Sequence, residues 1–348
     1  MIGFEYGNTR LRAWWSRLLD PGRFHDLITA TSIDHVLAAL GDTPYAEDVE
    51  TAITLNRGLG RLDEAVRRNL GRSLRAMASF YQGRPGEMVG LLTDRWDRHN
   101  LRVLLRVSEG PAPPDLLDPL LIPAGRLDEA ALRELAALPD VSSRLGLLVS
   151  WGLPSPESAH LLLRASRAAS PESALDQAYA ARIDEVLGDD REGAAAVLRS
   201  EIDSTNLLTA LRIRAASEEG EPVPDPGEVD FLPGGLIDAA RWPTVTVLDE
   251  PEQVVGEVGQ HHTIPGWVEA VRHWGEHHDL ALLTDQVRRA TTRAAVARFN
   301  RGDPLGFDIP VGYSFAKEAE VRNLRLIGRG IVHGLPADQV VDLFEEVA

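Results

Sequence analysis

The sequence contains no cysteine, which excludes disulfide bonds and thiolate metal sites from its 348 residues. It also lacks any apolar run near the roughly 18 residues that a membrane span requires, although 44% of its residues are hydrophobic. The first residues, Met1 to Arg12, carry none of the basic start, apolar run and cleavage site of a secretory signal. We therefore expect an ordered, soluble, cytoplasmic protein with enough apolar side chains to fill a core.

Lysine is almost absent as well, since Lys317 is the single lysine among 36 basic residues. The chain cannot supply a Gly-x-x-x-x-Gly-Lys-Ser/Thr phosphate loop, because Lys317 falls inside a predicted helix. No Gly-x-Ser-x-Gly nucleophile motif occurs either. A formal net charge of −17 disfavours nonspecific binding to nucleic acid, which needs a basic surface. The sequence therefore predicts no catalytic residues, no cofactor and no nucleic-acid partner.

Strand-like stretches with alternating polarity are scarce, and the best of them, Thr244–Leu248, has no obvious partner strand. Apolar residues instead recur at three- and four-residue spacings along most of the chain, as they do in amphipathic helices. We therefore predict an all-α fold. The predicted helices span residues 23–40, 61–82, 86–106, 128–138, 155–168, 172–187, 191–215, 267–299 and 314–330.

A ten-residue pattern, which we call the signature, occurs three times in these helices. It consists of an acid, an Asn-Leu pair, two mostly apolar positions and an arginine, in fixed register. The three asparagines lie 106 and 117 residues apart, a longer period than that of the common short solenoid repeats. This period predicts one helical unit built three times. The repeated residues are Asp97, Asn100 and Arg106, then Asp203, Asn206 and Arg212, then Glu320, Asn323 and Arg329.

A second motif has a similar period, because Leu121–Asp128 is echoed at an offset of 110 residues by Phe231–Asp238. Each copy follows a proline-rich connection, and proline interrupts helices and biases the residue before it toward extended geometry. Cutting at these connections predicts three helical units, at residues 1–118, 119–228 and 229–348, each near the usual size of a domain. The first unit has no evident counterpart of the second motif.

On a helix, the repeated acid shares one face with the apolar positions, whereas the repeated arginine points away. If that face is buried, the acid needs a cationic or hydrogen-bonding partner, because an unpaired buried carboxylate is strongly unfavourable. An arginine from a neighbouring helix is the natural candidate; the alternative is that the acids cap or solvate a helix edge. For the repeated asparagine we favour a structural bond to a neighbouring backbone group over contact with a ligand.

The single lysine has two interpretations. In the first, Lys317 is an intramolecular ion-pair partner of a carboxylate such as Glu320 or Glu201, at a place where an ammonium fits and a guanidinium does not. In the second, it is an incidental lysine in an arginine-rich chain. We carry Lys317 forward as a candidate ion-pair residue.

Five histidines cluster in the third unit, and His273 and His277 have the four-residue spacing that lets two imidazoles face one metal ion. The cluster lacks the second-position glutamate of a His-Glu-x-x-His motif, and Glu276 projects to one side of the line that joins the two histidines. We interpret it as a polar surface face and predict no metal site; a helical metalloenzyme is the alternative. The cluster comprises His261, His262, His273, His277 and His278.

The signature helices carry a family resemblance, together with Tyr6–Arg12 and a Tyr-x-x-x-Lys-Glu-x-Glu-x-x-Asn-Leu-Arg stretch that runs from Tyr313 to Arg325. These residues resemble the C subunit of the archaeal and bacterial A/V-type ATP synthase, a relative of the d subunit of the vacuolar proton pump. The resemblance covers essentially the whole chain. It implies a funnel of three similar helical domains with pseudo-threefold symmetry and a central cavity.

The resemblance also implies a function. In that family the protein is a non-catalytic part of the central rotor, and it joins the membrane-embedded proteolipid ring to the central shaft, which consists of the D and F subunits. It passes torque between ion translocation and ATP synthesis or hydrolysis. It would lie at the cytoplasmic face of the cell membrane, held by the ring and not by a span of its own. The alternative is a free-standing helical scaffold that binds another protein in its central cavity.

Overall fold

The computed structural model describes residues 3–107, 120–153, 171–248 and 250–345. The regular elements in these residues are helices, so the predicted all-α class is confirmed, and the described ranges contain no β-strand. None of the helices in them is long and apolar enough to cross a membrane.

The first third of the chain differs from the prediction in two ways: helices at Glu5–Trp15 and Ala46–Leu55 were not predicted, and residues 23–40 form two helices instead of one. The Ser32 side chain accepts a hydrogen bond from the backbone N–H of His35 and so begins a new helix within this range. Asp20 begins the preceding helix in the same way, through the N–H of Arg23. The helices are α1 (Glu5–Trp15), α2 (Pro21–Ile28), α3 (Ile33–Leu40), α4 (Ala46–Leu55), α5 (Leu59–Ala78) and α6 (Gly83–Leu105).

The middle third contains the predicted helices at residues 128–138, 172–187 and 191–215, and one further helix, Val141–Ser150, that was not predicted. Asp128 and Asp140 each begin a helix by accepting a hydrogen bond from the backbone N–H three residues later. The predicted helix at residues 155–168 lies outside the described residues. The helices are α8 (Glu129–Ala137), α9 (Val141–Ser150), α11 (Pro171–Leu187) and α12 (Gly193–Glu218).

The strand-like stretch Thr244–Leu248 is not a strand, because a short helix, α13 (Trp242–Thr246), covers most of it. Proline at the second residue of this helix suits a helix start, where its missing N–H costs nothing. Trp242 and Val245 are fully buried on the same side of the turn. Packing of these two side chains therefore overrides the local β-preference of the valines and threonines.

The predicted helix at residues 267–299 is broken at His278. This residue has a left-handed backbone, with φ of 53°, which ends one helix before the Asp279 side chain caps the next. The last third also contains two short 3-10 helices, η1 (Pro226–Glu228) and η2 (Ala239–Arg241). Its remaining helices are α14 (Pro251–His261), α15 (Trp267–His277), α16 (Leu280–Arg301), α17 (Asp308–His333) and α18 (Ala337–Asp342).

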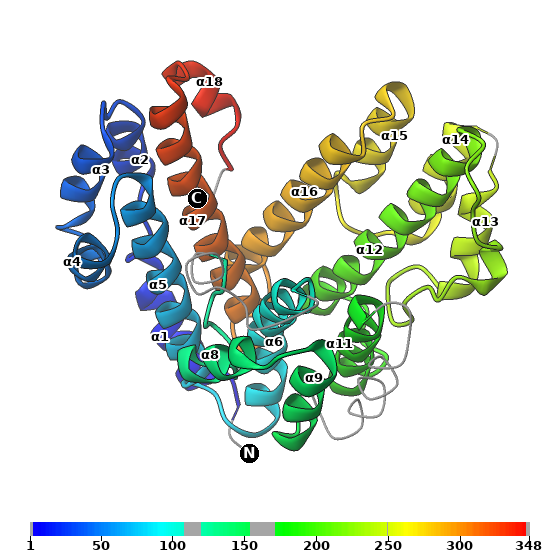
Figure 1. Cartoon of the computed structure of the whole chain (residues 1–348), viewed down its shortest axis with the longest axis horizontal. Helices are drawn as coiled ribbons and strands as arrows, with labels where there is room; N and C mark the ends of the chain where they lie inside the picture. Colours follow the sequence, from blue (N-terminus) through cyan, green and yellow to red (C-terminus); the bar gives the residue numbers. More distant parts are fainter. Residues whose placement is uncertain (1–2, 108–119, 154–170, 249, 346–348) are drawn as a thin grey trace.

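Three helical hairpins form the body of the molecule: α5 with α6, α11 with α12, and α16 with α17. The signature lies along the second helix of each hairpin. That helix also packs on the first helix of the next hairpin: α6 on α11, α12 on α16, and α17 on α5. The last of these contacts closes a cycle. Figure 1 shows α12, α16 and α17 splaying apart from a common base near the middle of the molecule.

Candidate functional site

Each signature asparagine is buried and exchanges two hydrogen bonds with the backbone of a single residue outside its own helix. The side-chain amide nitrogen donates to the carbonyl of that residue, and the side-chain oxygen accepts from its N–H, at 2.7–3.0 Å. This double pairing fixes one stretch of chain against one signature helix. The pairs are Asn100 with Ile122, Asn206 with Leu232, and Asn323 with Glu345.

The first two signature acids bind the same stretches of chain as the asparagines do, at residues a few positions further along. Asp97 and Asp203 each accept hydrogen bonds from two successive backbone N–H groups, at 2.8–3.3 Å. The expected arginine partner is therefore wrong for these two acids, because the loop backbone supplies the donors. Burial raises the pKa of Asp97 to about 6 and that of Asp203 to about 7, although the backbone donors act against it. The donors are Arg126 and Leu127 for Asp97, and Leu236 and Ile237 for Asp203.

We call each combination of a signature acid, its asparagine and the bound chain segment a loop junction. The loops in the first two junctions are the two copies of the second sequence motif, residues 121–128 on α6 and 231–238 on α12. In terms of the predicted units, each loop opens one unit and binds the signature helix of the unit before it. These two loop junctions therefore bind each motif loop to the signature helix that precedes it in the chain.

The third loop junction is divided between the two ends of the chain. Glu320 of α17 accepts a hydrogen bond from the backbone N–H of Leu19 at 2.5 Å. Three residues further along α17, Asn323 pairs with the backbone of Glu345 at 2.8 and 3.0 Å. The early and the late segments of the chain thus meet on α17, and the cycle of junctions closes there.

In the first unit, Leu19 occupies the position that the second motif occupies in the other two units. It is followed by Asp20, which caps α2, as Asp128 caps α8 and Asp238 caps η2. Leu19 and Asp20 therefore make contacts like those of the last two residues of the second motif, although the rest of the motif is absent from residues 1–118, as expected. An apolar residue before an aspartate forms too short and too common a signal for sequence reasoning to identify.

Gly235 is expected to be essential to the second loop junction. A methyl group on Gly235 would overlap the Asp203 carboxylate, and one on Gly125 would overlap Asp97 in the same way. Gly235→Ala should therefore displace the acid from its two donors and lower the free energy of unfolding by about 2–4 kcal/mol in urea unfolding. Gly90→Ala in α6 is the control, because no described atom lies within 4 Å of the added methyl. It should stabilise by about 0.5–1 kcal/mol; equal losses at both glycines would contradict the close-approach argument.

A largely buried ion cluster joins one residue from each signature helix. Arg95 of α6 donates to Glu201 of α12 through Nε, at 2.9 Å, and to Glu318 of α17 through Nη1, also at 2.9 Å. All three residues occupy the same register, two positions before the signature acid. Burial lowers the pKa of Arg95, but the two carboxylates outweigh burial and raise this pKa above its ordinary value. The cluster therefore connects the three signature helices at one point.

Lys317 forms an ion pair with Glu320, one of the two carboxylates considered from the sequence. Its Nζ lies 2.5 Å from Oε1 of Glu320 and 3.0 Å from the hydroxyl of Tyr45, which itself donates to Glu320 at 2.6 Å. Burial raises the pKa of Tyr45 well above its ordinary value, and the neighbouring carboxylate adds to the rise. A neutral hydroxyl therefore bridges the two charges. The other candidate, Glu201, binds Arg95 instead.

Two cavities lie beside the ion cluster, and arginines outnumber acids in both. The first, of about 320 Å³, is lined by α6, α12, α16 and α17. The second, of about 420 Å³, lies against α16, α17 and the C-terminal segment and shares two arginines with the first. We call them the arginine-lined cavities, and no sequence motif indicated them. The arginines are Arg95, Arg98, Arg102, Arg288 and Arg322 in the first and Arg288, Arg289, Arg322, Arg325 and Arg329 in the second; the acids are Glu201 and Glu318, and Asp285 and Glu345.

The three signature arginines are exposed and have different surroundings. Arg106 pairs with Glu172 at 3.1 Å. Arg212 lies on the surface of α12, whereas Arg329 lines the second cavity. The surroundings of the arginine therefore differ from one copy to the next, whereas every signature acid and asparagine forms hydrogen bonds with the backbone of another segment.

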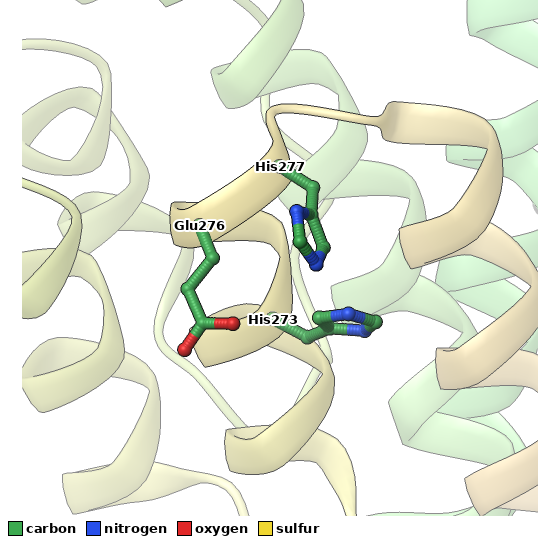
Figure 2. Close-up of side chains that lie close together, drawn as sticks. All are labelled: His273, Glu276 and His277. Carbon is green, nitrogen blue, oxygen red and sulfur yellow. The ribbon is translucent and has the colours of Figure 1, made fainter.

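The predicted histidine cluster is divided between two places. His262 is buried against a tryptophan ring and lies 3.7 Å from Asp203, and burial lowers its pKa to about 3. It therefore belongs to the second loop junction. His273 and His277 lie one turn apart on α15, close to Glu276 (Figure 2). Within the described part of the chain, these three residues form the one group that brings at least three potential metal ligands together.

Three helical hairpins in cyclic contact, each carrying a signature that binds a distant segment, define an all-α protein of repeated architecture. The fold and the repeats agree with the family resemblance seen in the sequence. The chain belongs to the ATP synthase (C/AC39) subunit family, whose sequence profile matches residues 7–343.

Curated relatives match along nearly the whole chain. The C subunit of the V-type ATP synthase of Deinococcus radiodurans is 27% identical over 341 residues, which cover 97% of this chain and 90% of the relative. The C subunit of the V-type ATP synthase of Thermus thermophilus is 28% identical over 345 residues, 97% of each chain. The C subunit of the A-type ATP synthase of Thermococcus onnurineus is 25% identical over 357 residues, 99% of this chain and 91% of the relative. The similarity therefore extends over all three hairpins.

Proposed function

We propose that this chain is the non-catalytic central-rotor component that couples a membrane-embedded proteolipid ring to the central shaft, formed by the D and F subunits. It passes torque between ion translocation and ATP synthesis or hydrolysis, and it supplies no nucleophile, base or cofactor. Family membership supports this role. The observation that carries it is the pair of arginine-lined cavities, the first where the three signature helices meet and the second beside α16 and α17, since they offer a concave, cationic socket to a partner.

The cyclic packing supports the structural part of the proposal. Residues 1–118, 119–228 and 229–348 form three units of a funnel with pseudo-threefold symmetry, and the signature acids and asparagines have structural roles. Each loop junction attaches one unit to its neighbour, and the Arg95 ion cluster connects all three. A force applied to one unit therefore reaches the other two through directional contacts as well as apolar packing. The protein lies at the cytoplasmic face of the membrane, held there by the ring.

Purification from native membranes tests the assignment. The chain is extracted with a mild detergent, and the proteins that accompany it are identified by mass spectrometry. Recovery with the proteolipid and the D and F subunits is the expected result. A chain that is recovered without any of them would overturn the rotor assignment and favour the free-standing scaffold.

Charge reversal in the second cavity should weaken binding to the shaft. Arg329→Glu places a carboxylate in the cationic socket, so we expect roughly tenfold weaker binding to the D–F complex of the same organism, measured by interferometry. The loss should shrink as salt is raised, because exposed charges are screened. Arg212→Glu is the matched control, since it alters the equivalent signature position on the outside of α12. Equal weakening by both variants would show that the cavity does not bind the shaft.

A further inference from the structure

We propose that His273, Glu276 and His277 at the end of α15 form a binding site for a divalent transition-metal ion that prefers imidazole ligands, such as Zn²⁺. This reverses the expectation of no metal drawn from the sequence, and the reason is the surroundings of His273 in the folded chain. The proposal is independent of the rotor function, because it concerns an ion and not a protein partner.

The three side chains lie within reach of one ion. One ligand atom from each is within 4.8 Å of the other two, and the two imidazole rings are 4.4 Å apart between their centres, tilted by 75°. Figure 2 shows the two imidazoles together on one flank of α15 and the carboxylate of Glu276 on the adjoining flank. Because Glu276 is exposed, its side chain is free to turn toward the imidazoles. Two imidazole nitrogens and a carboxylate oxygen, with water in the fourth position, are an established donor set for zinc.

A residue from the next helix orients His273. The side-chain amide nitrogen of Gln286 in α16 lies 2.5 Å from Nδ1 of His273, and its buried Oε1 has no hydrogen-bond partner among the described residues. If the two ends of this amide are exchanged, Oε1 accepts from the Nδ1–H group, and the amide nitrogen takes the buried position that Oε1 now occupies. Nε2 of His273 then carries the free lone pair that a metal ion needs. An outer partner of this kind accompanies most metal-binding histidines.

The local field also favours a cation. His273, Glu276 and His277 lie in the last turn and a half of α15, where the free backbone carbonyls give the helix end a partial negative charge. The carboxylate of Glu276 adds a full negative charge at the same place. These contributions act on a bound ion whether or not a partner protein covers α15.

Equilibrium dialysis of the purified full-length chain against Zn²⁺, followed by elemental analysis, tests the proposal. We expect one equivalent of zinc that a chelator removes. Gln286→Leu should weaken binding by about tenfold, as the loss of an outer partner does. His273→Gln and His277→Gln should each weaken it further, by at least about a hundredfold, because each removes a ligand.

His278→Gln is the matched control, since this neighbouring exposed histidine stands outside the group of three ligands. It should retain the zinc equivalent. Circular dichroism of each variant establishes that α15 remains folded, so a loss of binding reports on the ligand alone. The proposal is overturned if the wild-type chain retains no zinc, or if His278→Gln loses as much affinity as His277→Gln.

Discussion

Arg95→Met is expected to lower the free energy of unfolding by about 3–5 kcal/mol, the usual result of removing one partner from a buried ionic group. Methionine has a long, unbranched apolar side chain that still packs near Phe315, whose ring centre lies 4.3 Å from the guanidinium carbon. It leaves Glu201 and Glu318, however, without the cation that both now bind. Glu318 would retain only Arg322 as a cationic partner, at 3.8 Å, and the two neighbouring carboxylates would repel each other. Urea unfolding followed by circular dichroism at pH 7 measures the loss.

Arg106→Met is the matched control for this prediction. Arg106 pairs with Glu172, but the two side chains are 69% and 36% exposed, and such surface pairs contribute at most about 1 kcal/mol. Combining Arg95→Met with Glu201→Gln should recover part of the loss, because a single buried carboxylate then remains. If Arg95→Met costs no more than Arg106→Met, apolar packing alone holds the three signature helices together.

The repeated pattern made a large part of this arrangement predictable. The fixed register of the signature located Asp97, Asn100 and their counterparts, and the position of the acid on the apolar stripe required a polar partner for it if that face were buried. Capping residues such as Asp128 are a signal of the same local kind, because a side chain that binds its own backbone acts within a few residues. Local rules of this kind depend on neighbours in the sequence.

The identity of the partners was not predictable in the same way. Leu19 and Glu320 are 301 positions apart, and Arg95 and Glu318 are 223 apart. A local pattern indicates that a buried carboxylate needs a donor, but the fold decides which distant segment provides it. This is why an arginine was expected at Asp97 where a loop backbone binds, and why the arginine-lined cavities had no sequence signal.

Lys317→Met is the second substitution with a large expected effect, a loss of about 3–5 kcal/mol in the free energy of unfolding. Glu320 would keep its hydrogen bonds from Leu19 and Tyr45 but would lose the buried ammonium beside it. Thermal and urea unfolding measure the effect. Arg272→Met is a suitable control, because Arg272 also pairs with an acid three positions away, but on the surface, where the pair contributes at most about 1 kcal/mol.

Lys317→Arg then separates the two interpretations of the single lysine, because it preserves the charge and changes the shape. The ammonium lies 4.3 Å from the centre of the Tyr45 ring, and the side chain of Lys317 is only 3% exposed. A larger, planar guanidinium has to displace that ring or leave Glu320, so we expect a loss of about 1–3 kcal/mol. An arginine variant as stable as the wild type would mean that position 317 requires a positive charge but not a lysine. Because Glu320 also binds Leu19, the same displacement should loosen the junction that closes the cycle, and hydrogen exchange at the N–H of Leu19 should become faster.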